Sequence, residues 1–244
     1  MRAAWRAELS KIATVRGQWV AAILATAAMP LTSLLVATTA SVGAGATATS
    51  GAVTGSIVGL LAFGVWGASL AAGEYGTQTI VVSLATVPRR AVLYTAKIAA
   101  AATVAGVGAI VSATSALLLV LAVTPPGRQP LGNPATLVSV VLVMIAVAVV
   151  GVAIGVITRS PTMAVAIVVV ALLLPRAAGG LLGRLQPWVV GASPDTVVTQ
   201  IVGGTPLLTS QTYPAGTWAA AATMVLVAGA LASAGAVALM RRDG

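Results

Sequence analysis

Residues that could do chemistry are scarce in this chain, and the segment from Glu74 to Lys97 holds a dense group of them. From Glu74 to Arg90 it reads EYGTQTIVVSLATVPRR, between two apolar runs. The chain has no Cys and no His, which removes thiolate metal ligands, disulfides and the commonest general base. A Ser/Lys nucleophile pair remains chemically open, but no serine near Lys97 suggests itself as a partner.

Two further kinds of site are missing from the sequence. No GxxxxGK[ST] motif is present, so we expect no Walker-type nucleotide site. Ion-coupled carriers use acidic residues or His within the membrane. The acids here are Glu8, Glu74, Asp195 and Asp243, and none stands in the middle of an apolar run. We therefore expect no enzyme activity, no cofactor and no metal bound by this chain, and any transport to be powered by another subunit.

The composition indicates which solvent surrounds these residues. Hydrophobic residues make up 59% of the chain and charged residues 7%, against about 25% charged in soluble domains. So few charges cannot cover a surface that faces water, which points to a membrane protein. The net charge of +9 comes from basic residues at the ends of apolar runs, without aromatic interleaving. This pattern does not favour nucleic-acid binding.

The apolar runs predict an all-α membrane protein with six transmembrane helices in one domain, 1–244. A span needs roughly 20 apolar residues. The predicted spans lie near 19–40, 51–72, 98–123, 135–157, 162–182 and 218–240. A cleaved signal peptide is the rival interpretation of the first run, but the run is long and Glu8 precedes it, which favours a retained span.

Three other segments carry weaker signals. In 1–16, Trp5, Leu9 and Ile12 share one helical face, which predicts a helix in the membrane interface; the alternative is a solvated basic leader. The fifth span contains Pro175 and Arg176, so we expect a kink, with Arg176 at the outer interface or facing a cavity of the pathway. Residues 183–214 are expected to form a partly helical outer segment.

GxxxG motifs, which allow close helix packing, occur at three places. They start at Gly55, Gly151 and Gly179. In a chain with 26 glycines such matches are weak.

The basic residues predict the orientation of the six spans. With both termini inside, ten Lys and Arg residues lie on the inner side and three on the outer side, a clear positive-inside bias. The inner set is Arg2, Arg6, Lys11, Arg16, Arg89, Arg90, Lys97, Arg159, Arg241 and Arg242, and the outer set is Arg128, Arg176 and Arg184. An N-in/C-in arrangement follows, with 74–90 in the cytoplasm.

The 74–90 segment is predicted to contain a short amphipathic helix. Gly76 allows a sharp exit from the second span, and Thr77 is expected to be the N-cap. Ile80, Leu84 and Val87 are spaced i, i+4, i+7 and give one apolar stripe. Pro88 ends the helix, and Arg89 and Arg90 begin the next boundary. Such a helix either docks in a partner's groove or lies on the bilayer, and the residues themselves favour neither.

The same residues resemble a known family. Glu74-Tyr75, Gly76-Thr77, the stretch from Leu84 to Arg90 and Lys97 look like the segment after the second span of ABC-2 type transporter permeases. There a Glu and a Gly-Thr pair open a short coupling helix, and Pro-Arg-Arg and a Lys lead into the third span. The layout of six spans also fits. This chain differs in having Tyr75, Gln78 and Thr79 where many relatives carry basic residues.

The resemblance implies a permease subunit of an ABC exporter in a bacterial cytoplasmic membrane. It would dimerise with itself or with a sister permease, and separate ATPase subunits holding ATP-Mg would dock beneath it. The implied ATPase-coupling residues are Glu74, Tyr75, Gly76, Thr77, Ile80, Leu84, Pro88, Arg89 and Arg90. The apolar spans suit an amphiphilic or hydrophobic cargo such as a drug, lipid or peptide. The alternatives are a non-transporting membrane scaffold or sensor partner, and a self-powered carrier.

Overall fold

The computed structural model describes residues 1–39, 46–86, 89–125, 129–203 and 208–242. These residues form helices joined by short connections, with no strand in the described ranges. In chain order the elements are α1 (Arg2–Thr14), α2 (Arg16–Thr39), α3 (Ala48–Ala52), η1 (Val53–Gly55), α4 (Ser56–Gly76), α5 (Thr79–Thr86), α6 (Arg90–Val123), η2 (Pro134–Thr136), α7 (Leu137–Thr158), α8 (Pro161–Ala178), η3 (Gly179–Leu185), α9 (Gln186–Gly191), α10 (Pro194–Val202), η4 (Thr209–Gln211) and α11 (Thr217–Arg242).

Six helical stretches are long and apolar enough to cross a membrane, as the sequence predicted. They are Arg16–Thr39, Ala48–Gly76, Arg90–Val123, Pro134–Thr158, Pro161–Gly191 and Thr217–Arg241. The all-α class with six spans is thereby confirmed, and the chain is a multi-pass membrane protein.

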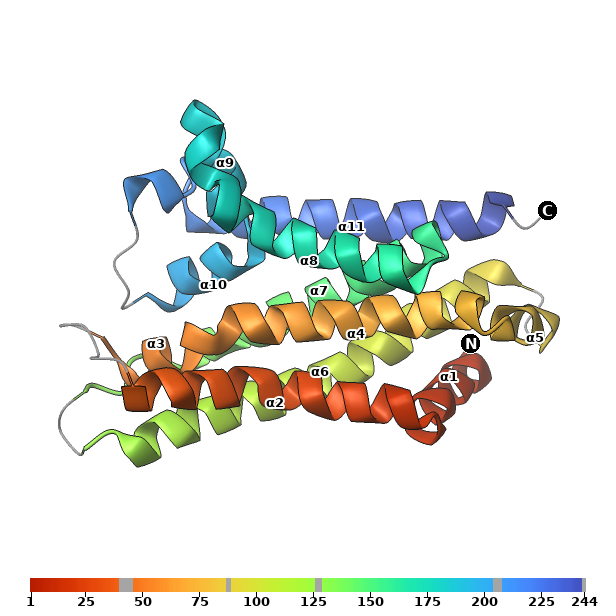
Figure 1. Ribbon diagram of the computed structural model, residues 1–244, viewed down its shortest axis with the longest axis horizontal. Helices are drawn as coiled ribbons and strands as arrows, with labels where there is room; N and C mark the ends of the chain where they lie inside the picture. Colours follow the sequence, from red (N-terminus) through yellow and green to blue (C-terminus); the bar gives the residue numbers. More distant parts are fainter. Residues whose placement is uncertain (40–45, 87–88, 126–128, 204–207, 243–244) are drawn as a thin grey trace.

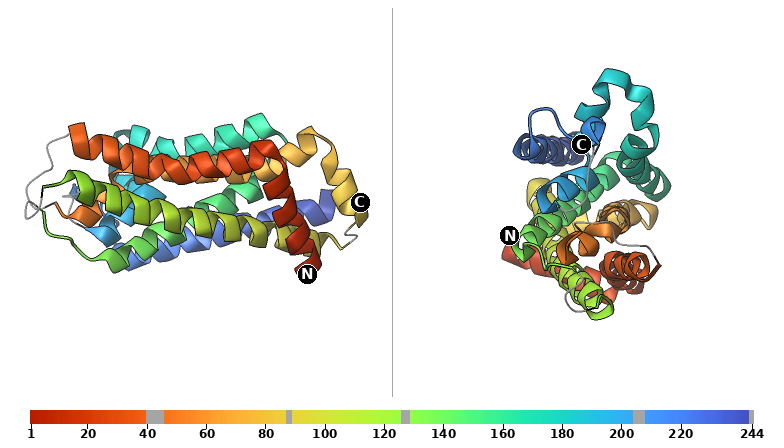
Figure 2. Two further views of the ribbon diagram at one scale, coloured as in Figure 1. Left: turned by 90° about the horizontal axis from the view of Figure 1, so that it is seen from below. Right: turned by 90° about the vertical axis from the view of Figure 1, so that its left-hand side faces the viewer.

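The long helices run side by side along one axis (Figure 1). At one end, here called the α1 end, lie α1, α5 and the last turns of α11 (Figure 1). The opposite end carries α3, α9 and α10 and is called the α10 end. Figure 2 shows α1 turning away from the axis of α2 across the end of the bundle. The first helix and the last turns of α11 thus lie at the same end, while the N-in/C-in orientation itself stays a prediction.

The centre of the bundle is the contact between α4 and α7. These two spans are the most buried, whereas few residues of α2, α8 and α11 are fully buried. Glycines allow this approach: a Cβ at Gly67 would collide with the carbonyl of Ala148, and one at Gly151 with the carbonyl of Gly64. A Cβ at Gly155 would collide with the backbone of α4 as well. The GxxxG motif at 151–155 therefore serves packing within the chain.

Two spans extend beyond their apolar runs. The second continues as α4 to Gly76, past the predicted end at 72, and the third starts at Arg90, ahead of the predicted start at 98. Glu74 and Lys97 consequently lie inside helices. The limits predicted from the sequence mark where the apolar residues stop. The helices themselves continue further, and the charged side chains in these extra turns, Glu74 and Lys97, pair with each other.

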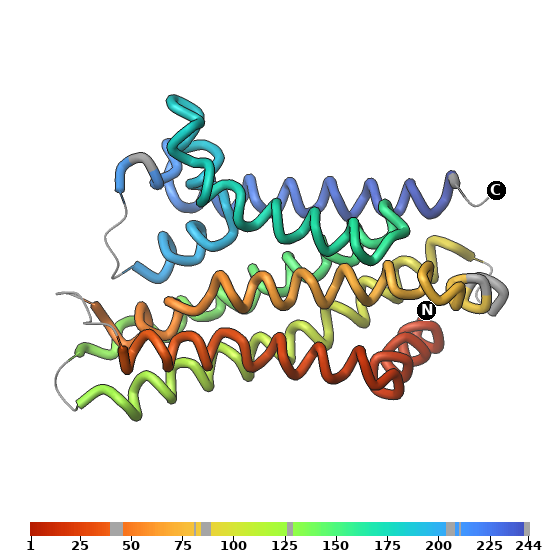
Figure 3. The backbone as a smooth tube through the Cα atoms, viewed as in Figure 1, coloured from red at the N-terminus to blue at the C-terminus, as the bar shows by residue number. Residues whose placement is uncertain are grey.

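The segment 183–214 is partly helical in its described residues, with α9, α10 and η4, while its position on the outer side stays a prediction. Figure 3 traces the chain from α8 into α9, which projects sideways from the bundle. Pro175 lies inside α8, which ends three residues later. Val197 and Val198 of α10 are fully buried, while Leu185 and Trp188 remain largely exposed. The outer segment thus covers the spans chiefly through α10, while α9 packs against the end of α8.

Candidate functional site

A cluster of charged side chains lies at the α1 end of the bundle. It contains both lysines of the chain and two of its four acids. Lys97 Nζ lies 2.6 Å from Glu8 Oε2 and 2.7 Å from Glu74 Oε1. Lys11 Nζ lies 2.6 Å from Glu8 Oε1 and 3.3 Å from Glu74 Oε1. We call these four residues the ion cluster.

Three helices build the ion cluster, and a fourth contacts it. The helix α1 supplies Glu8 and Lys11 from neighbouring turns, α4 supplies Glu74 from its last turn, and α6 supplies Lys97. Lys11 also donates a hydrogen bond of 2.8 Å to the hydroxyl of Ser83 on α5. The short helix between the second and third spans is therefore joined through one ammonium group to α1 and α4.

Three of the four residues of the cluster are largely withdrawn from solvent, whereas the side chain of Lys11 is 39% exposed. The exposed fraction is 4% for the side chain of Lys97, 5% for Glu8 and 12% for Glu74. Two positive and two negative charges balance, which offsets the large cost of burying any one of them. Glu74 Oε2 is buried and has no hydrogen-bond partner among the described residues.

The helix α1 is held by packing as well as by charge. Ile12 is buried in the core, and Trp5 and Leu9 pack against it, so the predicted apolar face of 1–16 exists. Arg2 and Arg6 are exposed, on the other side of the helix. In the structure this face covers protein, principally α6. Placement of α1 in the membrane interface stays a prediction.

The charges shift the pKa values of the two α1 residues. Burial raises the pKa of Glu8, but the ammonium of Lys97 and the hydrogen bond from Lys11 outweigh burial, so the pKa lies below its ordinary 4.5. Burial lowers the pKa of Lys11, but the hydrogen bond to Glu8 and the charge of Glu74 outweigh it, so the pKa lies above its ordinary 10.5. Both groups are charged at neutral pH.

The contact between Lys11 and Ser83 is the Ser/Lys pair that the sequence left open, although it involves Lys11 and not Lys97. A lysine that activates serine must give up its proton, which requires a lowered pKa. The pKa of Lys11 is raised by its carboxylate partners. The raised pKa keeps Lys11 protonated, so in this pair Lys11 donates a hydrogen bond to Ser83 and is not in the form that would accept a proton from it.

The turn between α4 and α5 differs from the sequence prediction. Thr77 is the C-cap of α4, and its hydroxyl donates to the carbonyl of Gly73 at 2.9 Å. The predicted N-cap role of Thr77 is wrong, because α5 begins at Thr79. Gly76 is still helical, and the reversal is made by Gln78, whose φ is 58°. The left-handed residue of the turn is thus two positions later than expected.

The other predicted coupling residues fall into separate surroundings. Glu74 belongs to the ion cluster and faces inward. The ring of Tyr75 lies under the guanidinium of Arg159, 5.3 Å from ring centroid to Cζ. Arg89 is exposed and Arg90 half-buried. The structure therefore does not gather these side chains on a single surface.

The predicted apolar stripe is only partly visible. Ile80 is half-buried and Val82 is 64% exposed. The side chain of Leu84, together with Val87 and Pro88, lies outside the described residues. A groove of about 620 Å³ runs between α5 and the bundle, and Lys11, Glu74 and Val82 are among the residues that line it. The ion cluster thus borders the groove beside α5.

Glu74 was named from the sequence, but its contact with Lys11 was not predicted, and neither were the contacts of Lys11 with Glu8 and Ser83. Lys11 is 63 positions from Glu74 along the chain, and Glu8 is 89 positions from Lys97. One signal was available: in a chain with four acids and two lysines, Glu8 and Lys11 stand at i, i+3, a spacing for paired side chains on a helix.

A second ion pair lies at the α10 end. Arg176 donates to Asp195 Oδ2 at 2.7 Å, and Ser56 donates to Asp195 Oδ1 at 2.9 Å. Asp195 is buried, while the side chain of Arg176 is 71% exposed. This pair fastens α10 to the ends of α4 and α8. Arg176 lies at the end of the bundle that the orientation predicts to be outer, and a role in the pathway stays a prediction.

Comparison with protein-family models found no match, and comparison with curated proteins found none either.

Proposed function

We propose that the protein is the transmembrane permease subunit of an ATP-driven ABC exporter of the ABC-2 type. A separate ATPase subunit, which holds ATP-Mg, docks at the α1 end and acts through α5. The cargo is amphiphilic or hydrophobic, and the membrane is the bacterial cytoplasmic membrane. A second copy or a sister permease completes the pathway.

The observation that carries this proposal is the link from α5 to the spans. Lys11 contacts Ser83 of α5, Glu74 of α4 and Glu8 of α1, and Lys97 joins the last two to α6. A movement of α5 would be transmitted to three other helices through the hydrogen bond from Lys11 to Ser83 and the ion pairs behind it. A coupling segment needs this property, because it must pass a push from outside the membrane to the spans.

The surroundings of α5 support docking of a partner. Val82 is largely exposed, and a groove of about 620 Å³ lies beside it. Amphipathic helices and grooves at the end of a bundle are common protein docking sites. No Walker motif occurs in the sequence, so the proposed source of energy is a different chain.

The exposed spans support a second permease subunit. A single chain of six narrow spans encloses little volume, and few residues of α2, α8 and α11 are fully buried. A cargo route between two protomers would use part of their surface. Its apolar character suits a drug, lipid or hydrophobic peptide.

Two matched variants test the docking. The tagged chain is purified in mild detergent from its own membranes, and co-purifying proteins are quantified. We expect a P-loop ATPase in stoichiometric amount, lost with Val82→Asp and retained with Leu131→Asp. Leu131 is an exposed apolar residue from the opposite end of the bundle. Each variant thus replaces an exposed apolar side chain with aspartate, at opposite ends of the bundle.

The purified complex is then placed in liposomes to measure transport of a lipophilic fluorescent dye and of a fluorescent phospholipid. ATP-dependent movement of either probe is expected. A chain that brings no ATPase would instead favour the membrane scaffold or sensor partner. Transport by this chain alone, driven by a proton gradient, would replace the proposal with a self-powered carrier.

A further inference from the structure

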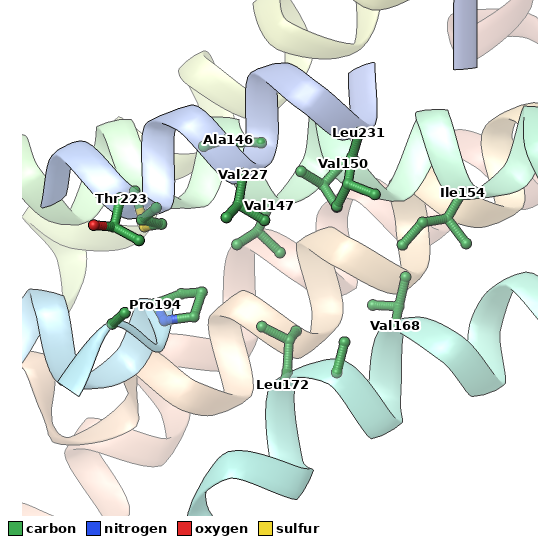
Figure 4. Close-up of a pocket in the computed structure, with 14 residues that line it drawn as sticks. Ala146, Val147, Val150, Ile154, Val168, Leu172, Pro194, Thr223, Val227 and Leu231 are labelled. Atoms are coloured by element: carbon green, nitrogen blue, oxygen red, sulfur yellow. The ribbon is translucent and has the colours of Figure 1, made fainter. Parts of the chain in front are cut away.

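A second hollow of the protein lies far from the ion cluster, between the spans themselves. It is a crevice of about 200 Å³ bounded by α7, α8 and α11, with the start of α10 closing one end (Figure 4). Among the fourteen described residues that line it, only Thr223 has a polar side chain. The hydroxyl of Thr223 is already bonded to the carbonyl of Ala219. The interior of the crevice therefore suits a hydrocarbon chain.

The crevice is open to the side of the bundle. Val227 of α11 points into it in Figure 4 and is 54% exposed. Val150 and Leu172 stand on the facing helices α7 and α8. Since α7, α8 and α11 contain predicted membrane spans, an opening between them is reached from the bilayer, where acyl chains are the available apolar molecules.

A cation stands at the α10 end of the crevice. Arg176 follows Leu172, a lining residue, by four positions and so lies one helical turn further along nearly the same face. Its guanidinium is held by Asp195, the neighbour of Pro194, which lines the crevice. Counted along α8, Arg176 lies about 22 Å from Pro161 at 1.5 Å per residue. Its long side chain can reach the headgroup region from this depth.

The guanidinium retains donors for a ligand. Arginine carries five N–H donors, and the structure gives one contact, from Nη1 to Asp195. The remaining fork of a side chain that is 71% exposed matches the oxygens of a phosphate. An apolar crevice next to a fixed cation has the two parts of a phospholipid site: one for a chain and one for a negative headgroup.

We propose that this crevice binds one anionic phospholipid from the leaflet at the α10 end. One acyl chain lies between α7, α8 and α11, and the phosphate is paired with Arg176. The site is independent of the proposed transport function, since a resident lipid requires neither an ATPase nor a cargo.

Native mass spectrometry of the purified protein with added phosphatidylglycerol or phosphatidylcholine tests the site. We expect a one-to-one adduct with phosphatidylglycerol, preferred roughly tenfold over phosphatidylcholine, because both lipids offer a phosphate but the choline cation of the second is repelled by the guanidinium. Arg176→Gln should abolish the preference, because it removes the charge while keeping a donor for Asp195. Arg184→Gln is the matched control, since it removes an exposed arginine eight positions further on and should leave the preference intact.

Val227→Trp tests the apolar part. Val227 is half-exposed, so a larger side chain is tolerated by the fold while it fills the crevice. The variant should lose the adducts with both lipids. Equal binding of the two lipids to the unaltered protein, equal loss of preference in Arg176→Gln and Arg184→Gln, or unchanged adducts in Val227→Trp would overturn the proposal.

Discussion

The ammonium of Lys97 lies 2.6 Å from Glu8 Oε2, although 89 positions separate the two residues. Both side chains are almost completely buried. This contact joins the first helix of the chain to the third span. Because Glu8 also accepts from Lys11, and Lys11 donates to Ser83, one chain of charged contacts passes from α6 through α1 to α5.

Lys97→Met should destabilise the protein strongly. The variant keeps a long flexible side chain but leaves Glu8 and Glu74 with Lys11 as their remaining cation in the cluster. Removal of one partner from a buried ion pair costs about 3–5 kcal/mol. Thermal unfolding in detergent, followed by tryptophan fluorescence, should show a clearly lower midpoint. Thr103→Val, at an exposed position of the same helix, should unfold like the unaltered protein. Equal midpoints for both variants would contradict a stabilising cluster.

Acid should release α1 from the bundle. The pKa of Glu8 is lowered in the folded protein, so its contribution to stability is present above about pH 4.5 and is lost as pH falls through the folded value. The pKa of Lys11 is raised, so its contribution persists below pH 10.5 and is lost only in stronger alkali. The attachment of α1 should thus be firm across neutral pH.

Spin labels can measure this release, because the chain has no native Cys. Ser10 of α1 and Thr95 of α6 are exposed, so the substitutions Ser10→Cys and Thr95→Cys provide two labelling sites. Pulsed EPR should give a narrow distance distribution at pH 7 that broadens below about pH 4.5. Glu8→Gln should broaden it already at pH 7. A distribution that stays narrow in acid would show that packing alone holds α1.

Gly151→Ala should weaken the contact between α4 and α7. A Cβ at Gly151 would lie 2.9 Å from the backbone nitrogen of Ala68 and would collide with the carbonyl of Gly64. Overpacking of this kind costs about 1–3 kcal/mol. Gly229→Ala is the matched control on α11, where a Cβ meets no atom within 4 Å. There alanine should be neutral or slightly stabilising. Thermal unfolding midpoints compare the two, and a normal midpoint for Gly151→Ala would show that the helices can separate at little cost.

Ser83→Ala tests the coupling role. It removes the hydroxyl that accepts from Lys11 and so loosens α5 from α1, while leaving the spans untouched. In the complex with the proposed ATPase, we expect ATP hydrolysis to continue and the transport per ATP to fall. Ser10→Ala, an exposed serine of α1, should leave the ratio unchanged. An unchanged ratio in Ser83→Ala would remove this hydrogen bond from the coupling route.

Much of the fold followed from local properties of the chain. Span number and approximate limits depend on the run of apolar residues needed to cross a bilayer, and this is visible in sequence. The short helix after the second span was also predicted, because its apolar spacing and proline are local. The prediction of Thr77 as an N-cap was wrong, because local sequence does not decide at which residue α4 ends. In the fold Thr77 caps the end of α4, and Gln78 takes the left-handed conformation of the turn.

The sequence by itself determined that the protein is a six-span, all-helical membrane protein and that its charges are concentrated outside the apolar runs. Only the tertiary structure decided which charges meet. A buried carboxylate requires a cation in contact with it, but any of several basic residues could supply one until the helices are packed. The meeting of Glu8, Lys11, Glu74 and Lys97 depends on the placement of α1, α4 and α6 against one another. The pairing of Arg176 with Asp195 depends in the same way on α10 folding back over the spans.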